Sequence, residues 1–280
     1  MSTKLRFLIL AALLFTMVFS ECAFKPLSGS EQIRVKGSDT MKNLMENLAR
    51  VYMESHPRVS IYVEGGGTGS GVNALIQGKI DICSASRPIE PEEVSRIAEK
   101  YKSVGIYSLI ARDALSIYTN PANPVTDLTL KQLKQIFTGE ITNWSDVGGK
   151  DMNITVLIRP SNSGTNHYFR EHILENQPYT DTAKIIPTTN QIVDYVRNHP
   201  DAIGYGGIAF GPDITHCKVN GINPSVENVR YDLYPISRYL YLYTVKKTSG
   251  KIRNFIDWIS SKEGQKVVEE TGFISLWPDN

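Results

Sequence analysis

The sequence predicts an α/β fold with a largely parallel sheet, and three observations lead to that prediction. Short apolar runs typical of buried strands alternate with segments whose apolar residues recur every three or four positions, as on one face of a helix. The loops that leave the strands are short and rich in Gly, Ser and Thr, and they lead directly into the helices. This alternation is typical of parallel α/β sheets, whose ligand loops lie beyond the carboxyl ends of the strands.

The first third of the chain shows the alternation most clearly. Strands are expected at residues 33–36, 59–63 and 80–83. Helices are expected from Met41 to Tyr52, from Val72 to Gln77 and from Pro91 to about Tyr101. Gly78 suits the end of the second of these helices, and Pro91 suits the start of the third.

The rest of the chain continues the same pattern. Further strands are expected at residues 106–118, 154–158, 202–205 and 239–245. Further helices are expected at 130–137, from Ser163 to about Leu174, at 188–198, and near the C-terminus around Phe255 and Val267. The segment from Thr138 to Trp144 has the composition of a specific turn.

The N-terminus has the features of a secretory signal. Lys4 and Arg6 precede an apolar run that continues to about Phe19, which is too short for a comfortable membrane span. Residues 1–22 are therefore predicted to be a signal peptide, with a retained anchor helix as the alternative. Cys22 lies where a bacterial lipoprotein carries its acylated cysteine, although Phe19 and Glu21 depart from the usual residues. Lipidation at Cys22 and ordinary cleavage near Ala23 both remain open.

The composition excludes several kinds of partner and site. A net charge of +1 argues against a nucleic-acid partner held by bulk electrostatics, so any anion must be held by local donors. The five histidines are scattered and no Cys-x-x-Cys motif occurs, so neither a metal nor another cofactor is expected. Cys83 and Cys217 lie in apolar or strand-like segments and are expected to be buried free thiols.

The segment from Arg159 to Thr165 is the most specific candidate for chemistry. A strand ends at Arg159, and Ser163, Gly164 and Thr165 then start a helix. Ser163 is a good N-cap, and Gly164 lets the backbone come close to a ligand. The unpaired amides and dipole of a helix N-terminus favour an anion, and an arginine adds a forked, charged donor. The alternative is an ordinary capped helix with Arg159 on the surface.

Three other loops repeat this chemistry at strand ends. Ser38 to Thr40 follow the first strand, the glycine-rich segment 65–71 with Ser70 follows the second, and Ser86 and Arg87 follow the third. Each loop alone is compatible with an ordinary cap or a flexible connection. The glycine-rich loop is not a Walker motif, because no Gly-Lys-Ser/Thr follows it. Together the four loops predict a site for a tetrahedral oxyanion.

An enzymatic function must be weighed against simple binding. Ser70 or Ser163 could be a nucleophile, but neither lies in a Gly-x-Ser-x-Gly elbow. No histidine and carboxylate are evidently matched to a serine. The sequence therefore favours a binding protein that catalyses no reaction, with a secreted phosphate-ester hydrolase as the alternative.

At these loops the sequence resembles the phosphate-binding proteins of bacterial ABC transporters, in the type II periplasmic-binding-protein superfamily. The resemblance runs from about Ile33 to the C-terminus. It rests on the four loops together with Asp81–Arg87, Ile136–Trp144 and Ala202–Tyr205, whose order and spacing are specific as a set. It implies extracytoplasmic capture of inorganic phosphate and delivery to permease subunits by a monomer, either in the periplasm or at the cell surface, with a possible lipid anchor in the membrane. Sulfate or molybdate is the alternative oxyanion.

The resemblance also implies the organisation of the chain and its site. Two α/β lobes, one of residues 32–114 plus 238–280 and one of residues 115–237, would close around the anion. The residues carried over as phosphate-binding are Ser38, Asp39, Thr40, Ser70, Ser86, Arg87, Arg159, Ser163, Gly164 and Thr165. The segment from Phe137 to Trp144 is expected to be a structural turn outside the site.

One position departs from the best-known members. They carry an aspartate after the third-loop serine, where it accepts a hydrogen bond from protonated phosphate, whereas this chain has Arg87 there. Asp39 is unusual in the first loop. We hypothesise that Asp39 supplies the missing acceptor and is balanced by Arg87 or Arg159. The alternative is that Asp39 is only an N-cap.

Overall fold

The computed structural model describes residues 31–277. The predicted signal peptide at residues 1–22 and Cys22 lie outside the described residues. Within the described part of the chain, no helix is both long enough and apolar enough to cross a bilayer.

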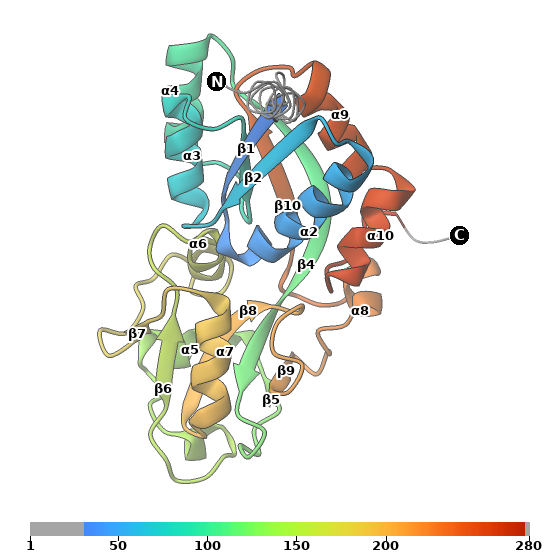
Figure 1. The fold of residues 1–280 in the computed structure, drawn as a ribbon. Coiled ribbons are helices and arrows are strands. Elements are labelled where there is room, and N and C mark those ends of the chain that lie inside the picture. The colour runs from blue at the N-terminus through green and yellow to red at the C-terminus, as the bar shows by residue number, and fades with distance from the viewer. Residues whose placement is uncertain (1–30, 278–280) are drawn as a thin grey trace, which may run out of the picture.

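The described chain forms two lobes, which lie one above the other in Figure 1. The sheet of the first lobe has the order β2-β1-β3-β10-β4. Its strands are β1 (Glu31–Gly37), β2 (Val59–Glu64), β3 (Ile82–Ala85), β10 (Ser237–Thr244) and the first part of β4 (Ile106–Thr119). β1 pairs in parallel with β2 and β3, whereas β10 runs antiparallel to both β3 and β4.

The helices of the first lobe cover this sheet. They are α2 (Asp39–Ser55), α3 (Thr68–Gln77), α4 (Pro91–Tyr101), α9 (Gly250–Ile259) and α10 (Lys262–Glu270). The apolar face of α2 packs on the sheet with α9 and α10, and α3 lies on the other side with α4 (Figure 1). Gly71 allows α3 to approach β1 closely, because a Cβ there would lie 2.6 Å from the Cα of Gly37.

The second lobe continues the sheet through β4. Its strands are β5 (Asp127–Leu128), β6 (Thr155–Ile158), β7 (Lys184–Ile185), β8 (Ala202–Gly207) and β9 (Thr215–Val219). Its helices are α5 (Leu130–Thr138), the 3-10 helix η1 (Trp144–Val147), α6 (Gly164–His172), α7 (Thr189–Asn198) and α8 (Val226–Arg230). β6 pairs in parallel with β7 and β8, and β4 pairs antiparallel with β8 and β9.

A single strand therefore belongs to both lobes. Residues 106–114 of β4 pair with β10, and residues 115–119 pair with β8. The two lobes keep separate apolar cores on either side of this crossing: one includes Leu44, Leu240 and Phe255, and the other includes Phe137, Trp144 and Tyr205. The loops that connect strands to helices in the two lobes meet between these cores.

The predicted α/β fold is confirmed, with differences in detail. The sheets are mixed rather than mostly parallel, because the crossing strands β4 and β10 pair antiparallel with their neighbours. α3 begins at Thr68 rather than at the predicted Val72, so half of the glycine-rich segment is helical. The short elements β5, β7, β9 and α8 were not predicted, since each is five residues or shorter and carries little periodicity.

Candidate functional site

Three helix N-termini converge between the lobes. They are those of α2 and α3 in the first lobe and of α6 in the second (Figure 1). The Oγ1 atoms of Thr40 and Thr165 lie 2.9 Å apart, which brings the first turns of α2 and α6 together. The amide of Gly69 donates to the carbonyl of Asn162 at 3.1 Å and brings α3 to the same place. The partial positive ends of three helices thus face one small region.

Hydroxyl groups line the meeting point of these helices. We call them the hydroxyl cluster: Ser38, Thr40, Thr68, Ser86, Ser163 and Thr165, each at most 3% exposed. The Thr68 hydroxyl accepts a hydrogen bond from the amide of Ser86 at 3.2 Å. Its oxygen also lies 3.5 Å from the Ser86 hydroxyl. Such groups can each donate to an oxyanion while accepting from the protein.

An ion pair spans the two lobes beside this cluster. Nη2 of Arg159 lies 3.0 Å from Oδ2 of Asp39, and the other carboxylate oxygen accepts from the amide of Gly66 at 2.8 Å. Arg159 also donates to the Pro187 carbonyl and to the Thr189 hydroxyl. Burial lowers the pKa of Arg159, and the nearby Asp39 carboxylate opposes that shift.

A second buried ion pair lies behind the cluster, on the crossing strands. Asp113 of β4 and Arg238 of β10 face each other in register, and Oδ2 of Asp113 accepts from Nε and Nη2 of Arg238 at 3.1 and 2.8 Å. Burial raises the pKa of Asp113, and the guanidinium opposes that shift. Nη1 of Arg238 donates to Thr165 Oγ1 at 3.1 Å, so this pair contacts the hydroxyl cluster directly.

Comparison with known proteins places this geometry in a family. The family described as "PBP superfamily domain" matches residues 26–263. The phosphate-binding protein PstS of Bacillus subtilis is 30% identical over 251 residues, which cover 88% of this chain and 81% of that protein. PstS of Borreliella burgdorferi is 26% identical, with 96% of this chain and 98% of that protein covered. The chain belongs to the phosphate-binding protein family of the PBP superfamily.

Solved structures agree with this assignment. A phosphate ABC transporter substrate-binding protein of Clostridium perfringens, solved with bound phosphate, matches with a TM-score of 0.82 and 31% identity, covering 88% of this chain and all of that one. An ABC-type phosphate transport receptor of Vibrio cholerae matches with a TM-score of 0.72 and 27% identity, covering 88% of this chain and 100% of that one. These neighbours fit the predicted type II periplasmic-binding-protein fold.

The residues expected from the family resemblance do not all occupy equivalent places. Ser38, Thr40, Ser86, Ser163 and Thr165 lie together in the hydroxyl cluster. Gly164 packs against that cluster, and Ser163 caps α6 as predicted. Ser70 lies on α3, where its hydroxyl donates to the Gly67 carbonyl at 2.9 Å.

Asp39 and Arg87 are each paired with a different residue. The N-cap of α2 is Ser38 and Asp39 is the first residue of the helix, so the alternative that Asp39 is only an N-cap is wrong. Of the two arginines considered as its partner, Arg159 is the one that pairs with it. Arg87 instead pairs with both carboxylate oxygens of Glu93, at 2.8 and 2.9 Å. That pairing favours a role in holding the third loop, and direct contact with an anion stays a prediction.

The pKa of Arg87 reflects this partnership. Burial alone would lower the pKa of the guanidinium. The hydrogen-bonded carboxylate of Glu93 and the nearby carboxylate of Glu90 outweigh burial and raise it. Arg87 is therefore a fully charged group whose charge is matched inside the first lobe.

Four residues that line or support the candidate site were not predicted from the sequence: Thr68, Asn162, Asp113 and Arg238. Asn162 bridges the lobes, because its side-chain amide donates to the Gly66 carbonyl at 2.9 Å. Thr68 lies in the glycine-rich segment 65–71, in which Ser70 was the residue expected to contact the anion. Arg112 and Asp113 are the only charged residues in the strand predicted at residues 106–118, and charges in such a mostly apolar strand are a signal that could have been used.

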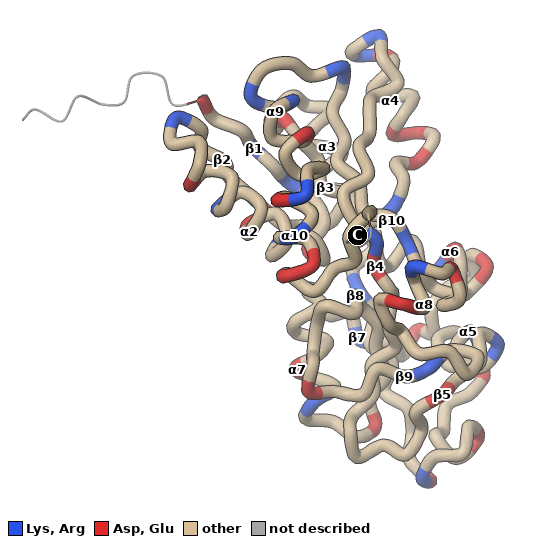
Figure 2. Tube along the Cα trace, turned by 90° about the vertical axis from the view of Figure 1, so that its right-hand side faces the viewer, with Lys and Arg blue, Asp and Glu red and all other residues tan. Residues whose placement is uncertain are grey.

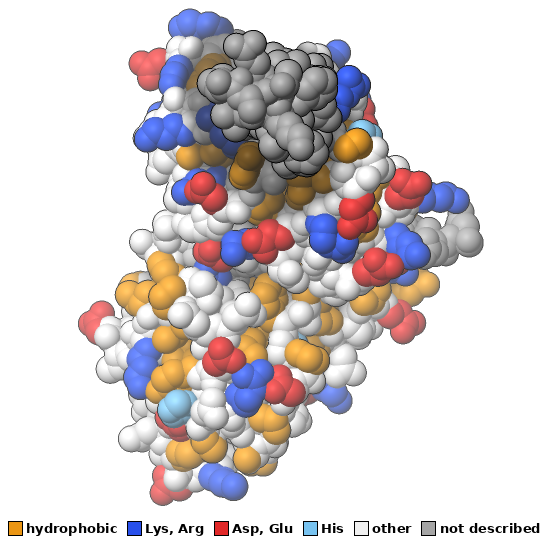
Figure 3. All heavy atoms as spheres, viewed as in Figure 1, with side chains coloured by type: hydrophobic (Ala, Val, Ile, Leu, Met, Phe, Trp, Pro, Cys, Tyr) orange, Lys and Arg blue, Asp and Glu red, His pale blue; other side chains and the backbone are white. Residues whose placement is uncertain are grey.

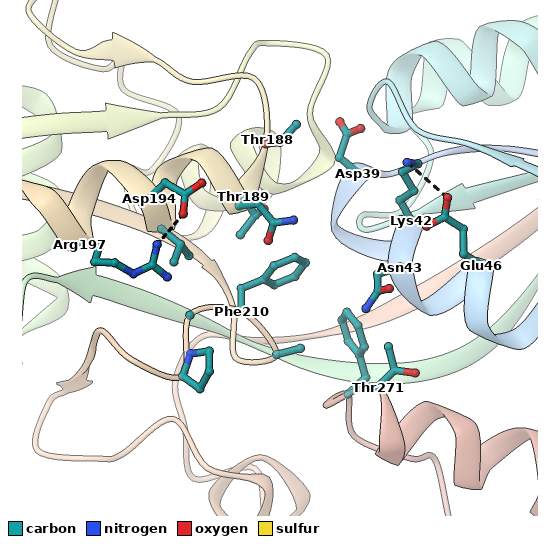
Figure 4. A pocket seen from close by; sticks show the side chains of 16 residues that line it. Asp39, Lys42, Asn43, Glu46, Thr188, Thr189, Asp194, Arg197, Phe210 and Thr271 are labelled. Carbon is teal, nitrogen blue, oxygen red and sulfur yellow. Dashed lines mark hydrogen bonds and ion pairs between the residues drawn. The ribbon is translucent and has the colours of Figure 1, made fainter.

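A groove runs outward from Asp39 between the lobes (Figure 4). Its volume is about 700 Å³, and it is lined on one side by α2 and on the other by α7, with Phe210 and Phe273 also in its lining. Lys42 pairs with Glu46 and Arg197 pairs with Asp194, so the charges along its walls are already matched. Positive and negative residues are likewise intermixed along the trace in Figure 2, and so are their side chains on the face seen in Figure 3. On that face, the described residues therefore form no surface patch of a single charge sign.

Cys83 and Cys217 are buried free thiols, as predicted. Trp144 of the predicted turn is fully buried in the second lobe, and its indole donates to the Asp201 carbonyl. Among residues 31–277, no group of three or more His, Cys, Asp or Glu side chains is arranged to hold a metal.

Proposed function

We propose that this protein captures inorganic phosphate outside the cytoplasmic membrane and delivers it to the permease subunits of an ABC transporter, without catalysing a reaction. The observation that carries the proposal is the convergence of three helix N-termini on the hydroxyl cluster between two lobes. Membership of the phosphate-binding protein family supports phosphate among the tetrahedral oxyanions.

The proposed site combines neutral donors with matched charges. It consists of Ser38, Asp39, Thr40, Ser70, Ser86, Arg87, Arg159, Ser163, Gly164 and Thr165. Hydroxyls and the first amides of the helices would surround the anion, and Arg159 would add a charged donor. Asp39 would accept a hydrogen bond from the protonated oxygen of phosphate. Sulfate at neutral pH has no proton to give, so an acceptor at this place favours phosphate.

The lobes are proposed to close around the anion. We assign residues 32–114 plus 238–280 to one lobe and residues 115–237 to the other. Their two main apolar cores, which follow this division except at residues such as Ala114 and Ile274, support it. Export through residues 1–22, a lipid anchor at Cys22 and a monomeric state complete the proposal, and a mass measurement of the mature N-terminus would test the anchor.

Calorimetric titration of the mature protein tests the function. We expect saturable binding of phosphate that is much tighter than binding of sulfate or molybdate. Arg159→Ala should weaken phosphate binding by about a hundredfold, because it removes a charged donor and leaves Asp39 without its partner. Arg253→Ala removes an arginine paired with Asp257 on the surface of α9 and serves as the matched control.

Three outcomes would contradict the proposal. Tight binding of sulfate or molybdate without phosphate would assign the site to another oxyanion. Turnover of a chromogenic phosphate ester by the purified protein would indicate a hydrolase. Equal phosphate affinity in the wild type and Arg159→Ala would place the anion elsewhere.

A further inference from the structure

Arg238 occupies an unusual place in the molecule. It is the second residue of β10, on one of the two crossing strands, and it is 5% exposed. Its register partner on β4 is Asp113, which is fully buried. Oδ2 of Asp113 takes two of the donors of the guanidinium, Nε and Nη2. The third nitrogen, Nη1, points toward the candidate site.

Nη1 contacts both lobes at once. It donates to the backbone carbonyl of Ser86 at 3.2 Å, in the third loop of the first lobe. It also donates to Oγ1 of Thr165 at 3.1 Å, in the first turn of α6 in the second lobe. Thr165 in turn lies 2.9 Å from the hydroxyl of Thr40. The guanidinium is thus the inner end of a hydrogen-bonded chain that leads to α2.

The chemistry of arginine fixes the direction of the first hydrogen bond in this chain. A guanidinium has donors and no acceptor, so Thr165 Oγ1 must accept from it and cannot donate its own proton to Arg238. The Thr165 and Thr40 hydroxyls hold two protons, and their mutual hydrogen bond uses one. The other proton is left as a donor on the side away from Arg238, where the helix N-termini converge. The positive charge behind the chain strengthens that donor.

A purely structural ion pair would be expected to look different. Buried pairs contribute little net stability unless their remaining polar atoms are hydrogen-bonded. Oδ1 of Asp113 is buried and makes no hydrogen bond of normal geometry among the described residues, although the backbone amide of Ile208 lies close enough to lower the pKa of the carboxylate. The carboxylate is therefore incompletely hydrogen-bonded, while all three guanidinium nitrogens donate: Nε and Nη2 to Asp113, and Nη1 to one loop of each lobe.

We propose that Arg238, held by Asp113, is a positioning residue for the bound anion: it orients and polarises the Thr165–Thr40 hydroxyl pair so that the pair donates into the cleft. The inference rests on the proposed function, because the ligand of that donor is phosphate. Since its third nitrogen contacts one loop of each lobe, Arg238 makes this contact only when both loops are brought together at the crossing strands.

A double-mutant cycle on phosphate affinity tests the proposal. The variants are Arg238→Lys, which keeps the charge but loses the fork, Thr165→Val, which removes the hydroxyl at constant shape, and their combination. We expect each single variant to weaken phosphate binding about tenfold or more. The double variant should have about the same phosphate affinity as the single variant that binds phosphate less tightly, because both substitutions break the same series of hydrogen bonds.

Two controls separate positioning from stability. Arg112→Lys changes the arginine that precedes Asp113 on β4 and pairs with Asp232 on the opposite side of the strand. This variant should have the phosphate affinity of the wild type. Thr165→Ser restores the hydroxyl that Thr165→Val removes, and it should recover most of the affinity that Thr165→Val loses. If Arg238→Lys does not fold, the same cycle is measured with Asp113→Asn, which releases the guanidinium from its anchor.

The outcomes distinguish this inference from the proposed function. Wild-type protein that does not bind phosphate contradicts the proposed function itself. If the wild-type protein binds phosphate, two results would overturn only the role of Arg238. One is wild-type affinity in Arg238→Lys, and the other is multiplicative losses of affinity in the double variant. Multiplicative losses would mean that Arg238 and Thr165 act independently.

Discussion

Asp39 and Arg159 connect the two lobes through one ion pair: Oδ2 of the first residue of α2 lies 3.0 Å from Nη2 of an arginine that is 1% exposed. The carboxylate is 19% exposed and faces the groove between the lobes. It therefore lies beside the hydroxyl cluster with its charge already matched. Its remaining lone pairs are free to accept a hydrogen bond from a protonated oxygen of a ligand.

Asp39→Asn should reduce discrimination between phosphate and sulfate by about tenfold or more, because an amide can donate to an oxyanion that carries no proton. The measurement is the ratio of the two dissociation constants by calorimetry. Glu54→Gln, which alters an exposed carboxylate at the other end of α2, is the matched control. An unchanged ratio in Asp39→Asn would remove this residue from the basis of selectivity.

Gly164→Ala should weaken phosphate binding by about tenfold or more, because tight packing tolerates little added volume. The new Cβ would lie 2.5 Å from the Thr68 hydroxyl and 2.6 Å from the Ser86 hydroxyl, both on the opposite lobe. Gly69→Ala is a control at the same interface, where a Cβ meets nothing nearer than 3.4 Å. Small-angle scattering with phosphate should show Gly164→Ala as the more open protein. Equal affinity and equal compactness in the two variants would contradict tight closure at Gly164.

Glu93→Gln should lower the free energy of unfolding by about 3 kcal/mol, because it leaves the buried charge of Arg87 without its main partner. Its effect on phosphate affinity should be smaller than that of Arg159→Ala, since Arg87 faces Glu93. Urea unfolding and calorimetry measure the two quantities. Glu54→Gln, in an exposed pair, should change stability by less than about 0.5 kcal/mol. A loss of affinity in Glu93→Gln as large as that in Arg159→Ala would instead favour direct contact between Arg87 and the anion.

Neither Cys83 nor Cys217 should react with iodoacetamide in the folded protein at about pH 8, because the thiolate is the nucleophile. Burial raises the pKa of Cys217 to about 11 and raises that of Cys83 further. Both thiols stay protonated below these values, so reactivity should rise only at strongly alkaline pH or on unfolding. Peptide mapping after labelling, with and without denaturant, identifies the modified residues. Rapid labelling of Cys217 in the folded protein would show that its strand opens readily.

The sequence pattern predicted the strand ends and their loops because those signals are local. The Ser163 cap, the helix starting at Pro91 and the buried strand starting at Ala202 each depend on a few neighbouring residues. The start of α3 was predicted too late, because glycine disfavours helix in isolation. Contact between Gly69 and Asn162 of the other lobe stabilises that first turn, and this contact is not visible locally.

The pairing of charges could not be predicted, because it depends on register and on the arrangement of the lobes. Asp113 and Arg238 are 125 residues apart and meet only through the antiparallel pairing of β4 and β10. Arg87 and Arg159 were both expected to face the anion, since both follow strands. Only the folded chain shows that one faces Glu93 within its own lobe and the other faces Asp39 across the cleft.

Within the described part of the chain three arginines are buried, Arg87, Arg159 and Arg238, and each has its own carboxylate partner. The cleft therefore creates little long-range attraction for an anion diffusing nearby. Its association rate constant should change by less than about threefold between low and high ionic strength, since screening affects only charges that are not already balanced. Such a protein would collect its ligand equally well in dilute and in salty surroundings, and would depend on encounter and fit rather than on electrostatic steering.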